Sequence, residues 1–285
     1  MVTISINSAT CIRCRKCVSI CPSALFTQNA DKSIRVNAEG CISCGHCVAV
    51  CPTESITHSE FPQGSIHRID RNALPSPDQV ELLIKARRSN RAFSDKEIAK
   101  TDLARIITAA HRAPTATNAQ GVKILLVTKP EVLKEISQLT IDTFNSAADK
   151  LENPLLKPLL KCVMAQNYRY IPVFRKLREE WRQGNDGILR RAKAALFFYT
   201  DSASRFGCQD SNLAYQNASL MAESLGVAQF YTGFVCSAAA MDKKRKLYHL
   251  LGIEGTIHAG MALGMPAFIF DKYIDRKELD LKVIE

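Results

Sequence analysis

Residues 11–22 read CIRCRKCVSICP, which places four cysteines within eleven positions and a proline directly after the last one. Residues 41–52 read CISCGHCVAVCP, so all four cysteines and the proline recur thirty positions later. A short loop with this spacing can wrap three thiolates around one inorganic cluster while its backbone N–H groups point at the sulfurs, and the proline then ends the turn. The repeat therefore predicts a small N-terminal domain built around metal-bound cysteines.

The other cysteines are sparse. Eight of the eleven lie within residues 11–51, and only Cys162, Cys208 and Cys236 follow. This distribution argues against a disulfide framework and favours metal in a reducing compartment. Structural zinc is the alternative, since CxxC pairs also bind zinc, but a tetrahedral site does not require two identical runs. We expect the three later cysteines to be small buried apolar residues.

The chain has 285 residues, of which 46% are hydrophobic, and this suits one small domain followed by one large one. No apolar run approaches the roughly 20 residues of a membrane helix. The first residues, MVTISINSATC, lack the charged and apolar regions of a signal peptide. We therefore expect a cytoplasmic protein without a membrane segment.

The net charge of +10 lies almost entirely outside the cysteine repeat, because residues 1–60 hold five basic and four acidic side chains. Residues 151–195 hold ten basic and four acidic side chains. This is either the solvated face of a helical insertion or a surface that steers anionic substrates or an acidic electron donor. No nucleic-acid-binding motif accompanies the charge, so we expect no nucleic-acid partner.

Residues 58–77 contain three prolines and little periodicity, so residues 59–76 are interpreted as a linker. A helix is predicted from Pro77, with Ser76 and Gln79 as a capping box, and a second from about Thr101. Further helices are predicted at 210–225 and 238–251, and strands at 122–128, 194–201, 227–233 and 257–264. Residues 140–193 form a basic, mostly helical insertion that can serve as a substrate lid. Because helices and strands do not alternate as βαβ units, we expect an α+β fold around a mixed sheet for residues 77–285.

The two cysteine runs resemble the C-x₂-C-x₂-C-x₃-C-P pattern of two-cluster bacterial ferredoxins, over about residues 3–58. The resemblance implies a ferredoxin-like domain at residues 1–58. It also implies that the fourth cysteine of each run ligates the other cluster. One [4Fe–4S] cluster would then be held by Cys11, Cys14, Cys17 and Cys51, and the other by Cys41, Cys44, Cys47 and Cys21.

The larger part contains neither GxGxxG after a strand nor a Walker motif, but RRSNRAF at 87–93 concentrates three arginines and a serine into an anion site. APTATNAQ at 113–120, SLGVAQFYTGF at 224–234 and ALGMPA at 262–267 follow in order. Together these segments resemble the nitroreductase family of FMN flavoproteins, across about residues 79–285.

The resemblance implies roles for individual residues. The FMN phosphate and ribityl chain would be bound by Arg87, Arg88, Ser89 and Arg91. The isoalloxazine would be contacted from the partner subunit of a homodimer by Pro114, Thr115 and Asn118. Flavin N5 would be approached by the turn at Thr232 and Gly233, and the phosphate would be closed by Arg276, with Lys277 as the alternative. Departures from the family at Gly121-Val122, Tyr231 and Met265 alter the pocket wall and concern the substrate more than FMN.

We therefore predict an oxidoreductase that passes electrons from a low-potential donor through two [4Fe–4S] clusters to FMN, and on to a small acceptor such as a nitroaromatic or a quinone. The donor is predicted to be a ferredoxin or flavodoxin-like protein, with NAD(P)H as the weaker option. The alternatives are a dedicated biosynthetic or dehalogenating flavin oxidoreductase, and a non-enzymatic electron-transfer or redox-sensing module. No side chain is predicted to be catalytic, and His258 is expected to be structural.

Overall fold

A computed structural model describes residues 2–155 and 157–285, and the chain divides into two compact units. The small unit comprises the residues up to Pro75 together with Thr115–Gln120. The large unit comprises Ser76–Pro114 together with Gly121–Glu285. None of the helices described in either unit has the length and hydropathy needed to cross a membrane.

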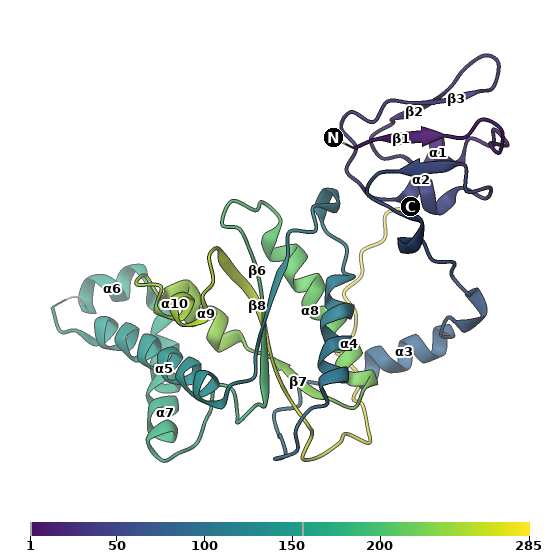
Figure 1. The fold of residues 1–285 in the computed structure, drawn as a ribbon. Coiled ribbons are helices and arrows are strands. Elements are labelled where there is room, and N and C mark those ends of the chain that lie inside the picture. The colour runs from purple at the N-terminus through teal and green to yellow at the C-terminus, as the bar shows by residue number, and fades with distance from the viewer. Residues whose placement is uncertain (1, 156) are drawn as a thin grey trace. The chain divides into compact units, whose positions relative to one another are not determined.

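The small unit repeats its secondary structure with the thirty-residue offset of its cysteines (Figure 1). Its elements are β1 (Ile4–Ile6), α1 (Lys16–Ile20), β2 (Phe26–Gln28), β3 (Ile34–Val36), α2 (His46–Val50) and β4 (Ile56–His58). The strands pair antiparallel across the two halves of the unit, β1 with β4 and β2 with β3. The two halves therefore depend on each other for their sheets.

The cysteine loops carry left-handed backbone at matching positions. Arg13 and Ser43 have φ of 59° and 49°, and Arg15 and Gly45 have φ of 62° and 72°. Non-glycine residues rarely adopt this conformation, and it occurs where a loop must turn its N–H groups inward. Short helices begin directly afterwards, so each loop is bent around a central point and then held by a helical turn.

The large unit contains a four-stranded sheet in the order β5-β6-β8-β7, formed by Lys123–Val127, Ala194–Thr200, Thr256–Gly264 and Ala228–Tyr231. Each neighbouring pair is antiparallel, whereas the sequence predicted a mixed sheet. β6 and β7 run in the same direction but are not hydrogen-bonded to each other, because β8 inserts between them. The α+β fold class is confirmed.

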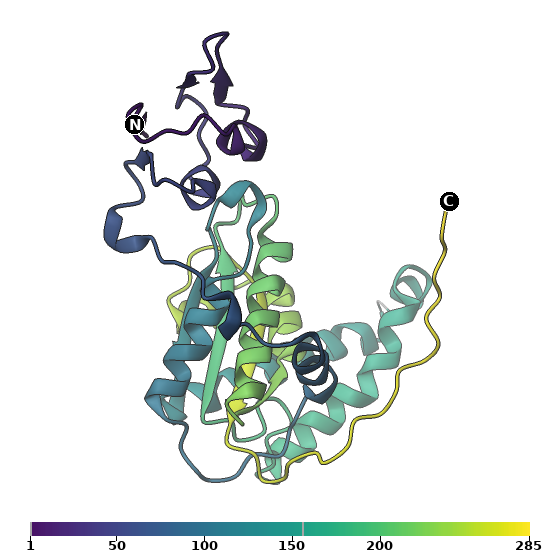
Figure 2. The same ribbon diagram turned by 90° about the vertical axis from the view of Figure 1, so that its right-hand side faces the viewer.

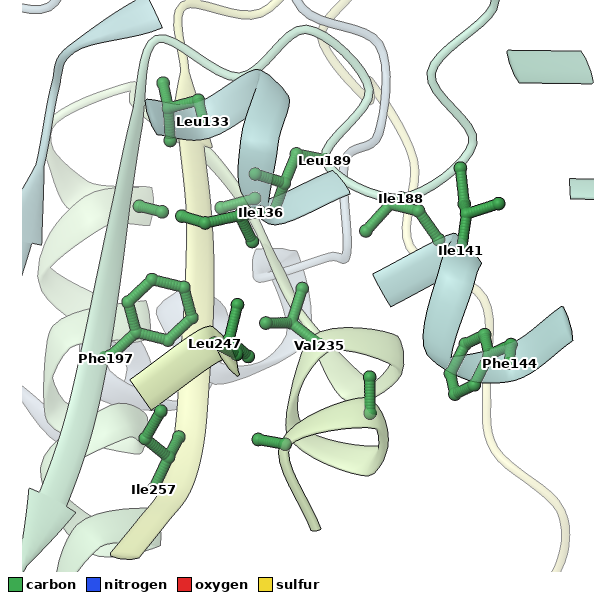
Figure 3. Close-up of a cluster of buried hydrophobic side chains, with 14 of the residues drawn as sticks. Leu133, Ile136, Ile141, Phe144, Ile188, Leu189, Phe197, Val235, Leu247 and Ile257 are labelled. Atoms are coloured by element: carbon green, nitrogen blue, oxygen red, sulfur yellow. The ribbon is translucent and has the colours of Figure 1, made fainter. Parts of the chain in front are cut away.

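Helices cover both faces of this sheet (Figure 1). The face formed by alternate residues such as Leu196 and Phe198 is covered by α4 (Lys100–His111) and α8 (Gly207–Ser224). The opposite face, with Ala195 and Phe197, is covered by α5 (Pro130–Glu152), α9 (Gly233–Met241) and α10 (Lys246–Leu251), and α7 (Ile171–Arg182) packs on α5, where Phe174 stacks on Phe144. Figure 3 shows side chains of α5, α9 and α10 closing on Phe197 and Ile257. Successive side chains of β6 therefore point to opposite faces of the sheet, and each face contributes to a different hydrophobic core.

The remaining α-helices of the described residues are α3 (Pro77–Ala86), which has the predicted capping box at Ser76 and Gln79, and α6 (Lys157–Val163). Short 3-10 helices lie at Gln63–Ser65, Arg71–Ala73, Ala116–Asn118 and Ala165–Tyr170. The single helix predicted at 238–251 is wrong. α9 ends at Met241 and α10 begins at Lys246, because the Asp242 carboxylate accepts the backbone N–H groups of Lys244 and Leu247 and forms a local turn. Arg245 has a left-handed φ of 53° in this turn.

The chain leaves β8 as an extended C-terminal arm, residues 268–285, without helix or strand (Figure 2). The arm carries large apolar side chains that are mostly exposed, such as Leu279 at 77% and Ile284 at 88%. Its start is anchored, since Asn90 Nδ2 donates to the Phe268 carbonyl at 2.8 Å. Beyond that point, several large apolar side chains of the arm stay unburied on the single chain.

Candidate functional site

The eight cysteines of the repeat surround two separate cavities in the small unit. One cavity is lined by Cys11, Cys14, Cys17 and Cys51. The other is lined by Cys21, Cys41, Cys44 and Cys47. In each cavity three cysteines come from one loop, and the fourth follows the helix of the other repeat. The structure therefore groups the cysteines in the two sets of four that the resemblance implied, with the fourth cysteine of each run in the other set.

Backbone N–H groups point at several of these sulfurs. Ser43 N donates to Cys41 Sγ at 3.4 Å, Ser55 N to Cys51 Sγ at 3.3 Å and Leu25 N to Cys21 Sγ at 3.5 Å. Burial would raise the pKa of the Cys51 thiol, but the hydrogen bonds from Ser55 and Thr53 outweigh it and lower that pKa. Burial raises the pKa of Cys47 to about 11. A bound metal cluster would offset this burial, because a coordinating thiol is deprotonated.

Asn118 belongs to the small unit and contacts one of the two cysteine loops. Its side-chain amide donates to the carbonyl oxygens of Ile42, at 3.2 Å, and Ser43, at 2.8 Å. Thr115, which the sequence grouped with Asn118, uses its hydroxyl to accept the Gln120 N–H at 2.9 Å. The turn at 115–120 is therefore closed on itself and bonded to the loop that carries Cys41 and Cys44.

In the large unit, the RRSNRAF segment is held against β7. Asn90 N donates to the Gln229 carbonyl at 3.0 Å, and Gln229 Nε2 donates to the Arg88 carbonyl at 3.3 Å. Gln229 is 1% exposed and also accepts the Tyr215 hydroxyl at 2.8 Å, while burial raises the pKa of Tyr215 to about 12. This buried network fixes the backbone from which the arginine side chains project.

A cavity of about 350 Å³ lies where this segment meets the end of β7. Arg91, Arg190, Tyr231, Thr232, Gly233 and Phe234 are among its lining residues, and its described lining contains no carboxylate. Arg91 is also placed over the Phe230 ring, 5.5 Å from its centroid. The cavity thus combines two guanidinium groups with aromatic walls, which suits a planar molecule carrying negative charge.

Gly233 gives the cavity a bare backbone edge. It is the first residue of α9, whose first N–H groups have no partner within the helix. A Cβ added at Gly233 would meet only the Tyr231 ring, at 3.8 Å, so internal packing does not require glycine there. Its lack of a side chain lets a ligand approach the backbone N–H groups closely. These features fit the ring of a flavin, with Arg91 and the start of α9 as its contacts.

The other sequence-predicted residues lie outside the lining of this cavity. Arg87, Arg88 and Ser89 follow α3 and are partly buried along β7, with the Arg88 guanidinium 5.6 Å from the centroid of Phe270. Pro114 ends the large unit before the 115–120 turn. Arg276 lies in the exposed C-terminal arm. Of the predicted flavin contacts, the single chain brings together Arg91, Thr232 and Gly233.

The structure corrects the prediction for two of the later cysteines. Cys162 and Cys208 are exposed, and only Cys236 is partly buried. Burial raises the pKa of Cys236 to about 11, against the smaller opposing effect of the Thr232 and Tyr231 side chains. Cys162 lies on α6, which has no fully buried described residue and packs the partly buried Leu160 against the core. His258 hydrogen-bonds Thr200 Oγ1 at 2.9 Å, as a structural histidine does.

Arg190 is a site residue that the sequence did not indicate. It precedes β6 in a segment where Arg190 and Arg191 both have left-handed backbone, with φ of 55° and 59°. Arg190 lines the 350 Å³ cavity, and Arg191 lines a larger neighbouring cavity of about 510 Å³ beside Trp181 and Lys134. The larger cavity contains none of the sequence-predicted residues. We take the smaller one as the candidate site because it collects three of them.

Known proteins and protein families match the two parts of the chain separately. Residues 84–265 match the nitroreductase family, and residues 3–52 match the 4Fe-4S dicluster domain. A nitroreductase with bound FMN from Bacteroides fragilis is 21% identical, with a TM-score of 0.55, over 73% of this chain and 99% of that one. One from Desulfitobacterium hafniense, also with bound FMN, is 18% identical, with a TM-score of 0.56, over 74% and 100%. No curated protein matches the chain.

Proposed function

The chain belongs to the nitroreductase family, and we propose that it is an oxidoreductase that passes electrons from a low-potential donor, through two [4Fe–4S] clusters and FMN, to a small organic acceptor such as a nitroaromatic or a quinone. The observation that carries the proposal is that one chain holds both sites. Two sets of four cysteines surround cavities in its small unit, and an arginine-lined cavity opens at Gly233 in its large unit.

The bound groups supply complementary chemistry, since a [4Fe–4S] cluster transfers single electrons whereas FMN accepts one or two. The protein binds and orients them. Each cysteine set holds one cluster, and N–H groups such as those of Ser43 and Ser55 stabilise the negative charge on the sulfurs. In the large unit, Arg91 and Arg190 supply positive charge, and Gly233 leaves the flavin edge accessible.

We propose that Arg87, Arg88 and Ser89 bind the phosphate and ribityl chain, and that Arg276 reaches the phosphate in a homodimer. The exposed C-terminal arm supports the homodimer, because an arm with side chains such as Leu279 and Ile284 gains stability by packing on a second copy. Truncation after Tyr273 removes Leu279 and Ile284 and keeps the hydrogen bond that anchors the arm at Phe268. We expect the truncated chain to elute as a monomer, and an unchanged dimer would exclude this role for the arm.

Two alternative functions can be tested with the same purified protein. A dedicated biosynthetic or dehalogenating oxidoreductase would use the same cofactors but turn over few general acceptors. A non-enzymatic electron-transfer module would reduce its FMN and then pass electrons to no small acceptor. A panel of nitroaromatics, quinones and halogenated rings, assayed with reduced ferredoxin, NADH and NADPH in turn, separates the three readings and identifies the donor.

The proposal is tested by a stepwise reductive titration of the anaerobically purified protein, followed by absorbance and EPR. We expect cluster signals and flavin bleaching in the same sample, with about two flavin electrons per chain. The matched control is the Cys44→Ala, Cys14→Ala double variant, in which the flavin should still titrate with dithionite but no longer with a ferredoxin donor. Cluster reduction without any flavin signal would overturn the proposal.

A further inference from the structure

His58 is the last residue of β4, and its ring contacts a cluster cysteine. Its Nε2 lies 3.5 Å from Cys41 Sγ, and the residue is only 2% exposed. The ring is packed against Phe61, with 4.7 Å between ring centroids, and Phe61 in turn lies against Gly45 in the same cysteine loop. The imidazole is therefore held in one position beside the sulfur.

The other ring nitrogen fixes which atom carries the proton. His58 Nδ1 accepts the backbone N–H of Glu60 at 3.1 Å, so Nδ1 is unprotonated in this arrangement. In a neutral imidazole the proton is then on Nε2, the nitrogen that faces Cys41. The contact is consequently an N–H···S hydrogen bond in which His58 donates and the thiolate accepts.

The first repeat has no equivalent. Thirty residues before His58 lies Gln28, whose Nε2 donates to the carbonyl oxygens of Arg13, at 3.4 Å, and Lys32, at 3.0 Å. Among the described residues, no side chain donates to Cys11, the counterpart of Cys41. The contact in the first cavity that most resembles the one made by His58 comes from the Thr53 hydroxyl. It lies 3.7 Å from Cys51 Sγ and is also hydrogen-bonded to Ser55 Oγ at 2.7 Å. The two cavities are thus chemically different despite their repeated cysteines.

We propose that His58 is a positioning residue that raises the reduction potential of the cluster held by Cys21, Cys41, Cys44 and Cys47, and thereby makes the two clusters unequal. Reduction adds one electron to the cluster and increases the negative charge on its thiolates. An N–H donor stabilises the more negative state more strongly, so it favours reduction. No proton is transferred. This inference depends on cluster binding alone and not on FMN or on an acceptor.

The test is EPR-monitored potentiometry of the anaerobically purified full chain with chemical mediators. In His58→Leu we expect one of the two cluster potentials to fall, with about a tenfold loss in the ratio of reduced to oxidised cluster at a fixed potential, equivalent to 59 mV for one electron. His58→Gln keeps an N–H donor and should recover part of the shift. Thr57→Val changes an exposed residue of the same strand; it is the matched control and should shift neither potential. Two unchanged potentials in His58→Leu, or two equal shifts, would overturn the inference.

A second measurement covers the case in which His58→Leu does not retain its clusters. Pulsed EPR of protein labelled with ring-¹⁵N histidine, in a His46→Gln background that removes the other histidine of this cavity, should show nitrogen coupling to one reduced cluster, and this coupling should disappear when His58→Gln is added. Coupling that persists in His58→Gln would contradict the assignment. Because mediators reduce the clusters directly, failure of the proposed electron transfer to an acceptor would leave both measurements interpretable.

Discussion

The side-chain amide of Asn118 donates to the carbonyl oxygen of Ser43 at 2.8 Å, so a residue that the sequence assigned to the flavin is bonded to a cysteine loop. Its second hydrogen bond, to the Ile42 carbonyl, fixes the neighbouring peptide of the same loop. These are the peptides between Cys41 and Cys44. Asn118 therefore supports the ligand geometry of one cluster, whatever contact it makes with a partner subunit.

Asn118→Leu should destabilise that loop. Loss of two hydrogen bonds should cost about 1–3 kcal/mol of the free energy of unfolding of the small unit. The measurement is cluster absorbance during anaerobic denaturation, with the EPR line shape of the reduced clusters as a second readout. Thr117→Ala is the control, because its hydroxyl donates only to the adjacent Ala116 carbonyl. An effect on FMN affinity alone would contradict this role.

Because the fourth cysteines are exchanged, variants in different cysteine runs should lose the same cluster. Cys21→Ala should remove the same cluster as Cys41→Ala, although Cys21 lies in the first run. Cys51→Ala should remove the same cluster as Cys11→Ala. Iron analysis and EPR of the four variants would check this, with each variant retaining about half of the iron. If Cys21→Ala instead matched Cys11→Ala, the ligand sets would be wrong.

Arg91→Ala should weaken FMN binding. Loss of a charged hydrogen-bond donor is worth roughly 1.5–3 kcal/mol, which corresponds to roughly a tenfold to hundredfold increase in Kd. Fluorescence titration of the flavin-free protein measures it. Arg105→Ala, an exposed arginine of α4, is the control and should bind FMN as the wild type does. Equal affinity of both variants would remove Arg91 from the site.

Two glycines near the cavity should respond differently to alanine. At Gly233 the added Cβ has free space, so Gly233→Ala should keep the melting temperature of the flavin-free protein and weaken FMN binding. At Gly260 the Cβ would lie 2.2 Å from Thr232 Oγ1, so Gly260→Ala should lower stability by about 1–3 kcal/mol. Thermal unfolding with and without FMN distinguishes the two effects. A large loss of stability in Gly233→Ala would contradict the ligand-facing role.

The three later cysteines should differ in reactivity. A pKa of about 11 leaves only about a thousandth of the Cys236 thiol ionised at pH 8, because burial favours the neutral form. Alkylation of Cys236 should therefore be slow and should accelerate about tenfold per pH unit up to that pKa. The exposed Cys162 and Cys208 should react readily at pH 8. Mass spectrometry of the cluster-loaded protein after brief iodoacetamide treatment checks this order.

The sequence predicted most of the fold because its signals were local. The cysteine spacing, the capping box at Ser76 and the apolar strands around Phe197 each depend on nearby residues, and the structure contains the corresponding elements. The break at Asp242 was missed because it depends on a side chain that caps its own turn in place of continuing the helix. The three later cysteines were judged by residue type, which does not determine exposure.

The candidate site was only partly predictable. Arg91, Thr232 and Gly233 lie in recognisable segments, and the structure gathers them at one cavity. Arg190 is one of the ten basic residues in 151–195, and no motif distinguishes it from the others; its position depends on the left-handed backbone at residues 190 and 191. His58 is likewise the last residue of a strand that carries no motif, and the pairing of that strand with Ile4 holds it beside Cys41. Such residues are selected by tertiary contacts between segments far apart in the sequence.

The exchange of the fourth cysteine also has an evolutionary consequence. One repeat supplies three ligands to its own cavity and one to its neighbour, so a half-length peptide could complete no site by itself. Two copies of that peptide could complete two sites, with their strands paired between the copies as β1 pairs with β4 and β2 with β3. The small unit thus has the architecture expected of two copies of one half-length peptide joined in a single chain. The two halves are not identical, since Gln28 occupies in the first the position that His58 occupies in the second.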